Sequence, residues 1–241
     1  EFHIDPLIGN ELSLPTNRPR VELHSDFIYV VLHFPAFKHS HSNKKTDQEI
    51  DFIIGNNFLI TARYDSVDSI YKFAKKIEVS SLLDKKNIEY PAGYLFYLLL
   101  KEIYRAIFDE LSYIEDWIKD IETKIFNGNE KQMVFALSNV GRILLDFKKT
   151  TTLHSEILTS LEIAGRKLFG DHFQYYTRAA LDEFHRVKSS LENNIDIVRE
   201  LRETNDSLLN TKQNEVTKIL TVLAFIAVPL SLVTSIFQID K

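Results

Sequence analysis

The chain has 241 residues, 44 % of them hydrophobic, so it is long enough to build a substantial apolar core in one large or two small domains. It contains no cysteine, which excludes disulfides and thiolate metal sites and leaves oxygen and imidazole as ligands for any cation. The formal net charge is -5 and no Lys- or Arg-rich run is present, which argues against a nucleic-acid partner.

The first stretch of the chain, to about residue 80, has the composition of strands and turns. Residues 21–34 are rich in β-branched and aromatic side chains and follow a turn-prone segment, which predicts one strand. Residues 50–61 predict a hairpin, whose tight turn would use the positive φ that Gly55 and Asn56 tolerate. The polar segment 39–45 holds two histidines without a third ligand, so we interpret it as a solvated loop rather than a metal site.

From Tyr94 onward, apolar residues recur every three or four positions, as in amphipathic helices. A first helix is predicted to end at residues 127–129, a second to cover 130–149, and a third to end between Gly165 and Gly170. Asp171 is expected to cap the helix that follows. The sequence therefore predicts an α+β class, a mixed sheet flanked by helices. An N-terminal domain would cover residues 1–93, and 94–170 would form helices that pack on a stalk.

The C-terminal third of the chain predicts one very long helix. Neither glycine nor proline occurs between Asp171 and Pro229, and one apolar stripe runs along this interval. Residues 219–237 carry no charge and are long enough to cross a hydrocarbon core of about 30 Å. We assign a stalk helix to 171–218 and a transmembrane helix to 219–237. Because the run lies at the C-terminal end, it is not a secretory signal. A tail-anchored protein and a part of a longer chain with a second span both remain open.

Small or polar residues recur on one face of this helix, and bulky apolar residues lie largely on the opposite side. From the stripe alone, a face for close helix packing and the lining of a water-filled pore are both open interpretations. The members of the stripe are Asn214, Thr217, Thr221, Ala224, Val228, Ser231 and Ser235.

Several segments carry a family resemblance. Residues 214–221, followed by 228–230, resemble the end of the stalk and the first span of the CorA-type divalent cation channels, a group that includes the ZntB branch. Residues 15–22, 28–35 and 49–61 resemble successive stretches of that family's cytosolic domain. The similarity covers nearly the whole chain in the family's order.

The resemblance implies a homopentamer in the cell or inner membrane, with the α+β domain in the cytosol and the long helices forming a funnel. The first span of each subunit would line a central pore for Mg²⁺ or a related ion such as Zn²⁺, Co²⁺ or Ni²⁺. The cation would be cargo, no cofactor is implied, and the partners would be further copies of the chain and the lipid bilayer. Asn214 would form a polar ring at the cytosolic end, and Leu220 and Val228 would form apolar constrictions that gate by dewetting. Ordinary packing is the alternative for Leu220.

The outer mouth departs from the family pattern. The family usually closes the first span with Gly-Met-Asn, whose Asn binds an incoming hydrated cation. The corresponding residues here are Gln238, Ile239 and Asp240. A ring of Asp240 carboxylates would ligate cations more strongly than amides but with less discrimination. The alternative is that Asp240 is a polar residue at the end of a span.

Regulation departs from the pattern as well. In the family, acidic residues between neighbouring cytosolic domains bind magnesium and hold the channel closed. The corresponding positions lie near Lys38 and Ala179, neither of which can ligate a hard cation. Asp182 and Glu183 lie one turn away and are weak metal candidates, with ordinary solvated residues as the alternative. We therefore expect gating that is insensitive to millimolar cytosolic magnesium.

Three classes of function are compared on this basis. The first is a cation channel or transporter. The second is a non-conducting membrane scaffold or regulator, or a tail-anchored interaction protein. The third is an enzyme, which is not expected, because the sequence has no zinc-protease histidine pair, no phosphate-cradling glycine loop and no nucleophile elbow. His33 and His154 are expected to be packed or surface residues rather than ligands.

Overall fold

The computed structural model describes residues 8, 9, 12–16, 18–36, 47–64, 70, 71, 73–75, 77, 78 and 91–239, with side chains as far as residue 235. The chain divides into two compact units, which are treated separately below. The sheet unit comprises Glu1–Asp116 and Gly141–Ile195, and the stalk unit comprises Trp117–Val140 and Asp196–Lys241.

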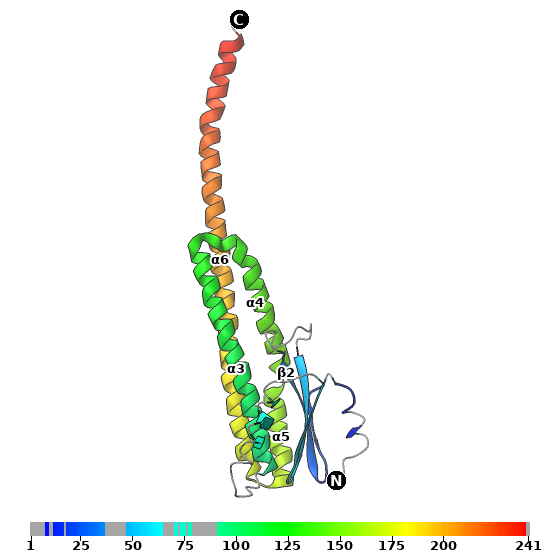
Figure 1. Ribbon diagram of the computed structural model, residues 1–241. Helices are drawn as coiled ribbons and strands as arrows, with labels where there is room; N and C mark the ends of the chain where they lie inside the picture. The colour runs from blue at the N-terminus through cyan, green and yellow to red at the C-terminus, as the bar shows by residue number, and fades with distance from the viewer. Residues whose placement is uncertain are drawn as a thin grey trace. The chain divides into compact units, whose positions relative to one another are not determined.

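The sheet unit contains four strands that pair in sequence order (Figure 1). The sequence predicted a mixed sheet, and every pairing between the described strands is antiparallel. The physical reason is that neighbours in sequence are neighbours in the sheet, and connections as short as residues 24–26 and 56–58 join only antiparallel strands. The α+β class itself is confirmed. The strands are β1 (Arg20–Leu23), β2 (Phe27–Pro35), β3 (Asp47–Gly55) and β4 (Leu59–Arg63).

The single strand predicted over residues 21–34 is wrong, because the chain turns between β1 and β2. The amide of His24 donates to the carbonyl oxygen of Phe27 at 2.9 Å and closes the hairpin. Ser25 and Asp26 are residues that favour turns, but the long apolar run around them concealed this signal.

The hairpin predicted at Gly55 is present, but its turn differs from the expected one. Residues 56–58 connect β3 to β4, and the amide of Gly55 donates to the carbonyl oxygen of Phe58 at 2.9 Å. Among the described residues, positive φ occurs only at Gly128 and Gly170, so Gly55 does not supply it. Glycine allows the Phe58 ring to approach closely there, since a Cβ at position 55 would lie 2.2 Å from that ring and the ring would have to move.

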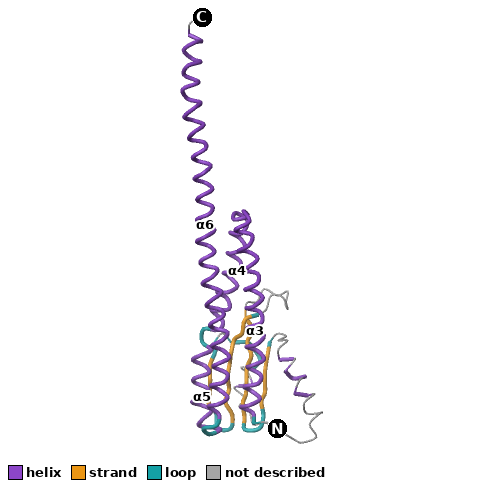
Figure 2. The backbone as a smooth tube through the Cα atoms, turned by 90° about the vertical axis from the view of Figure 1, so that its left-hand side faces the viewer, coloured by secondary structure: helices purple, strands orange, loops and turns teal. Residues whose placement is uncertain are grey.

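Four long helices follow the sheet in the sequence (Figure 2). Within the sheet unit, one face of the sheet packs on them through buried aromatic side chains. Phe52 meets Phe96 edge to face at a centroid distance of 5.2 Å, and Phe34 lies 5.0 Å from the ring of His154. Burial of each such ring contributes roughly 1.5–3 kcal/mol. The helices are α3 (Ala92–Lys124), α4 (Glu130–Thr151), α5 (His154–Phe169) and α6 (Phe173–Ile239).

The helix boundaries lie close to the predicted ones. A five-residue π-helical turn, Ile125–Asn129, separates α3 from α4, and Gly128 within it has a φ of 91°, which L side chains rarely adopt. The expected cap at Asp171 is wrong, because its carboxylate instead accepts from Arg166 Nε at 2.9 Å. The amides of Phe173 and Gln174 bond to backbone carbonyl oxygens. The single helix predicted through stalk and span is confirmed, and α6 contains Pro229 without a break.

Candidate membrane span and pore face

The last part of α6 is an apolar helix that the described chain leaves uncovered. It supplies an 18-residue window with a mean hydropathy of 2.2, none of which is buried, so α6 qualifies by length and composition as a candidate membrane span. Within the stalk unit, no described helix lies beside the part of α6 that extends past the α3–α4 turn (Figures 1 and 2). Phe225, for example, is 82 % exposed. An apolar surface of this extent marks contact with lipid or with other chains.

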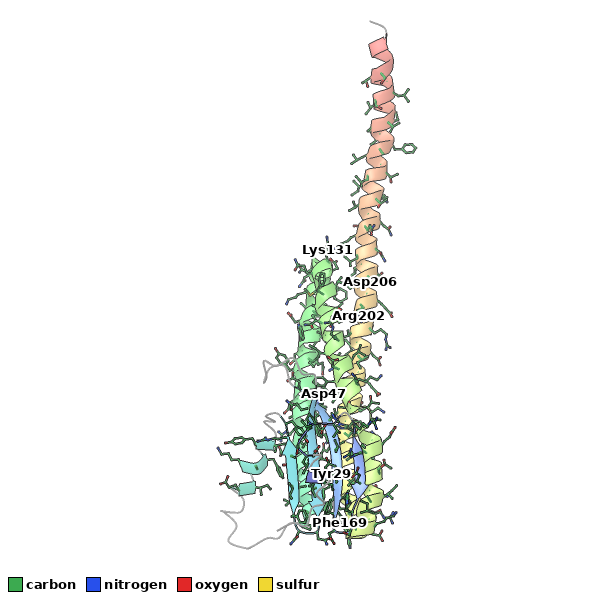
Figure 3. The ribbon with its side chains drawn as sticks, turned by 90° about the vertical axis from the view of Figure 1, so that its right-hand side faces the viewer. Tyr29, Asp47, Lys131, Phe169, Arg202 and Asp206 are labelled. Atoms are coloured by element: carbon green, nitrogen blue, oxygen red, sulfur yellow. The ribbon has the colours of Figure 1, made fainter. Side chains whose placement is uncertain are left out.

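Before this exposed end, α6 has one covered side within the stalk unit. Val198, Leu201 and Asn205 are buried there at 5 % exposure or less. The α3–α4 hairpin is tied to this side of the helix by two contacts. Figure 3 labels one of the residues involved, Arg202 on α6. Arg202 Nη2 donates to the carbonyl oxygen of Leu137 at 3.0 Å, and Lys212 Nζ donates to Glu130 at 2.7 Å. The hydrogen bond from Lys212 lowers the pKa of the Glu130 carboxyl.

The polar stripe that begins at Asn214 lies on the other side of α6. Successive helical residues are rotated by about 100°, so Asn214, nine residues after buried Asn205, is about 180° away from it. From Asn214 to Ser235 the steps alternate strictly between three and four residues. This is a seven-residue period, which keeps one face of a helix directed at a shared axis in a bundle. By the same rotation the other members of the stripe lie about 80° to 160° from Asn205, so the stripe is directed away from the side that α3 and α4 cover.

The hydroxyl groups of the stripe are satisfied by their own helix. Thr221 Oγ1 donates to the carbonyl oxygen of Thr217 at 2.8 Å, and Ser235 Oγ donates to that of Ser231 at 2.9 Å. Thr217 Oγ1 makes the same type of bond to Gln213 at 2.9 Å. Such bonds let a hydroxyl lie in an apolar environment without a loss of hydrogen bonding. The hydroxyls alone therefore do not distinguish a pore lining from a packing face.

The remaining predicted pore residues are placed as follows. Val228 and Ala224 belong to the stripe, whereas Leu220 flanks it, about 60° from Thr217 and about 100° from Thr221 around the helix. Gln238 and Ile239 lie in the last turn of α6, and their side chains are outside the described residues, as is Asp240. The roles assigned to these residues stay predictions.

The weak metal candidates lie on α6 within the sheet unit. Asp182 is exposed. The Glu183 carboxylate lies 3.9 Å from Lys101 Nζ and 3.6 Å from Arg186 Nη1, so two cationic side chains already surround it. Within the described part of the chain, no three His, Asp or Glu side chains are placed to hold a metal ion together. Ala179 is half-buried, while Lys38 and the 39–45 segment lie outside the described residues.

The two histidines predicted to be packed or surface residues are indeed packed. His154 is fully buried, and its Nε2 donates to the carbonyl oxygen of His33 at 2.7 Å. Its Nδ1 accepts from the Tyr104 hydroxyl at 2.9 Å, which fixes a neutral tautomer. Burial lowers the pKa of His154 to about 4.

Sequence reasoning missed a buried polar cluster on β3. Glu49 and Asp51 are at most 6 % exposed, although they alternate with apolar residues in a central strand. The signal available in the sequence was two carboxylates spaced two apart inside a strongly apolar run, which places both on one face of the sheet.

A sheet packed on helices, with one helix that continues into an exposed apolar segment long enough to cross a bilayer, is the arrangement expected of a membrane protein with a large domain outside the lipid. Over residues 1–239 the sequence matches the family described as CorA-like Mg²⁺ transporter protein. The chain belongs to this family of divalent cation transporters, and the resemblance noted in the sequence is confirmed.

Individual relatives agree with the family match. The chain is 26 % identical over 239 residues to the cobalt/magnesium transport protein CorA of Thermotoga maritima, covering 99 % of this chain and 67 % of the relative. The solved structure of the complete CorA magnesium transporter from Methanocaldococcus jannaschii has a TM-score of 0.76 at 21 % identity, covering 92 % of this chain and 70 % of that one. The full-length CmaX protein has a TM-score of 0.78 at 15 % identity, covering 97 % and 70 %. The chain thus spans about two thirds of the curated relatives it matches.

Proposed function

We propose that this chain forms the cytosolic domain and the first pore-lining span of a divalent cation channel. The observation that carries the proposal is the position of the stripe from Asn214 to Ser235, whose members lie between about 80° and 180° around α6 from buried Asn205 and recur with a seven-residue period. Each copy would thus keep its own helices on the outside and present small polar groups to a common axis.

The assembly we propose is a homopentamer in the cell or inner membrane, with the sheet unit in the cytosol. Five copies of one exposed stripe would surround a pore, and the bulky residues on the opposite side, such as Ile226 and Leu230, would meet lipid or other spans. Asn214 would form the polar ring at the cytosolic end, and Leu220 and Val228 the apolar constrictions.

The cation we propose is Mg²⁺ or a related hard or borderline ion such as Co²⁺. Two relatives are named as cobalt/magnesium transport proteins, and the cysteine-free chain offers no soft thiolate ligands. Gln238, Ile239 and Asp240 would form the outer mouth, where Asp240 carboxylates would hold an incoming cation by charge.

A flux assay tests the function. The full-length protein is reconstituted in liposomes that contain a divalent-sensitive dye, and Mg²⁺, Co²⁺, Zn²⁺ or Ni²⁺ is added outside. We expect influx, and we expect Asn214→Leu to reduce it at least tenfold, since an apolar ring replaces a polar one. Asn139→Leu, the same change at an exposed position on α4, is the matched control and should conduct normally.

Two results would contradict the proposal. The first is an absence of influx for all four cations, which would identify a non-conducting scaffold. The second is a monomer in native mass spectrometry from mild detergent, because a single copy of the stripe encloses no pore.

A further inference from the structure

The buried carboxyl pair on β3 is the starting point. Glu49 and Asp51 are two residues apart, so their side chains lie on one face of the sheet, opposite to the face of Phe52. Glu49 is 6 % exposed and Asp51 is 1 % exposed. Two adjacent carboxylates at this depth are strongly unfavourable unless each oxygen has a hydrogen-bond donor or a counter-charge.

Half of the four carboxyl oxygens have such a donor. Asp51 Oδ2 accepts from the hydroxyls of Tyr29 at 3.0 Å and Tyr64 at 3.1 Å. Glu49 Oε1 accepts from the amide of Thr16 at 2.8 Å. The other two oxygens, Glu49 Oε2 and Asp51 Oδ1, are buried and have no hydrogen-bond partner among the described groups.

His33 does not supply the missing donor. Its Nε2 lies 2.9 Å from Glu49 Oε2, but that contact lacks hydrogen-bond geometry. The same nitrogen lies 2.7 Å from the carbonyl oxygen of Thr16, and because a carbonyl only accepts, Nε2 must direct its hydrogen there. Glu49 Oε2 is therefore still without a donor.

Arg20, a cation that favours the ionised form of Asp51, is shared with another carboxylate. The Arg20 guanidinium lies 5.4 Å from the centre of the Tyr29 ring and is paired with Glu22 at 2.8 Å. A pocket of about 360 Å³ lies beside His33, and its lining includes the charged side chains of Asp47, Asp146 and Lys149. Among the described residues, the titratable or charged groups that face the pair or line this pocket are Arg20 on β1, Tyr29 and His33 on β2, Tyr64 after β4, and Asp47, Asp146 and Lys149 at the pocket.

We propose that Glu49 and Asp51 hold one proton between them at neutral pH, carried on Glu49 Oε2 and donated to Asp51 Oδ1, and that this proton keeps the segment around Thr16 clamped to the sheet. One shared proton gives both remaining oxygens a partner and leaves a single negative charge, which the two tyrosine hydroxyls solvate.

The electrostatics of the pair agree with this assignment. Burial raises the pKa of both the Glu49 and the Asp51 carboxyl. Hydrogen bonds act in the opposite direction at both carboxyls, from Tyr29 and Tyr64 at Asp51 and from Thr16 at Glu49. Asp51 accepts from two hydroxyls and Glu49 from one amide, so the geometry places the proton on Glu49.

The clamp holds one residue, Thr16, by both of its backbone polar groups. Glu49 and His33 are direct cross-strand partners, and between them they bind the amide and the carbonyl of Thr16. Upstream of this point, Ile8 and Leu12 pack on the apolar part of the same sheet face, formed by Phe27, Tyr29, Val31 and Ile53. The segment is therefore a strap over the sheet, and its closure binds one proton more than its opening does.

The first test detects the proton directly. Infrared difference spectra are recorded at pH 7 between the full chain in detergent and its Glu49→Gln variant, whose amide accepts from Thr16 and donates to Asp51 without ionising. We expect loss of one protonated-carboxyl band in the variant. Asp26→Asn, which removes an exposed carboxyl in the β1–β2 turn, is the matched control and should lose none.

The second test measures the strap. Hydrogen exchange of a peptide covering residues 12–16 is followed from pH 5 to pH 7 and corrected for intrinsic rates. Because the closed form binds one extra proton, its opening constant should rise up to tenfold per pH unit in the wild type. Glu49→Gln should remove this slope, and Asp26→Asn should keep it.

Three results overturn the proposal. One is that wild type and Glu49→Gln show identical protonated-carboxyl bands. Asp51→Asn checks this result: Glu49 there loses its acidic neighbour and should ionise, so the band should disappear in that variant too. Another is a band that emerges only after chelation, which would place a cation between the carboxyls. The last is an unchanged pH slope in Glu49→Gln.

Discussion

The sheet unit and the last part of α6 contain the same kinds of residues but differ in burial and in hydrogen-bond partners. Phe52 is completely buried, whereas Phe225 is 82 % exposed. Asp51 relies on tyrosines from β2 and from the end of β4, whereas Thr221 bonds within its own helix. The sheet unit buries its own apolar core, whereas the end of α6 satisfies the hydrogen bonds of its hydroxyls but buries none of its apolar side chains. Its apolar surface must be completed by a bilayer or by other chains.

The largest effect should come from placing a charge on either face of that segment. Ala224→Arg, on the stripe, should abolish cation flux while the protein still inserts, since a fixed positive charge in the proposed pore repels cations. Ile226→Arg, on the opposite side, should instead reduce the amount of protein in the membrane, because arginine at the centre of a span costs about 2.5–3.5 kcal/mol. Membrane fractionation together with flux per inserted protein separates the two. Equal effects of the two variants would contradict the assignment of faces.

A matched pair of phenylalanine truncations sharpens the same contrast. Phe52→Ala should lower the free energy of unfolding of the sheet unit by about 3–5 kcal/mol, because it opens a cavity in a packed core. Phe225→Ala removes an equal volume from an uncovered helix and should change that free energy by less than about 0.5 kcal/mol. Urea unfolding in detergent, followed by circular dichroism, measures both. A comparable loss for Phe225→Ala would show that the end of α6 packs on its own chain.

The pH dependence of stability should show the buried histidine. The pKa of His154 is lowered from 6.5 to about 4 in the folded protein, so the unfolded chain binds its proton first. Its contribution is therefore complete above pH 6.5 and falls as the pH drops toward 4, by about 3 kcal/mol in total. Unfolding curves between pH 7 and pH 4 should show a smaller loss for His154→Gln than for wild type. His185→Gln, at an exposed position, should behave as wild type.

The smallest expected effect is an absence of response. Glu183 is surrounded by Lys101 and Arg186, and Ala179 offers no ligand, so magnesium at millimolar concentration should leave the proteolysis rate of the cytosolic part unchanged. Limited trypsin digestion with and without Mg²⁺ measures this, with Ca²⁺ as a comparison for ionic strength. Protection by Mg²⁺ alone would reveal a regulatory site.

The elements that the sequence predicted well are those with a long local period. The run of α6 from Phe173 to Ile239 follows from an uninterrupted helical pattern, and the turn at Gly128 follows from a strong local signal. The wrong predictions concern single residues whose role depends on a contact with another side chain. Gly55 serves close approach to a phenylalanine ring instead of a positive φ, and Asp171 binds Arg166 instead of capping α6.

Of the two polar features discussed above, the sequence revealed the stripe on α6 but not the carboxyl pair on β3. The stripe from Asn214 to Ser235 is visible as a pattern, but the pattern is compatible with both a pore and a packing face. The carboxyl pair at Glu49 and Asp51 was not recognised, because a sequence does not show whether an acidic residue in a strand faces water or other polar groups.

By itself the sequence determined that the chain builds a sheet, several helices and one apolar segment able to span a bilayer, since periodicity and composition act between residues close in the chain. Only the tertiary structure decided which side of α6 is covered, through Arg202 and Lys212, and that His154, Glu49 and Asp51 are buried. Burial and partner choice depend on residues 13 to 121 positions apart, for which local pattern carries no information.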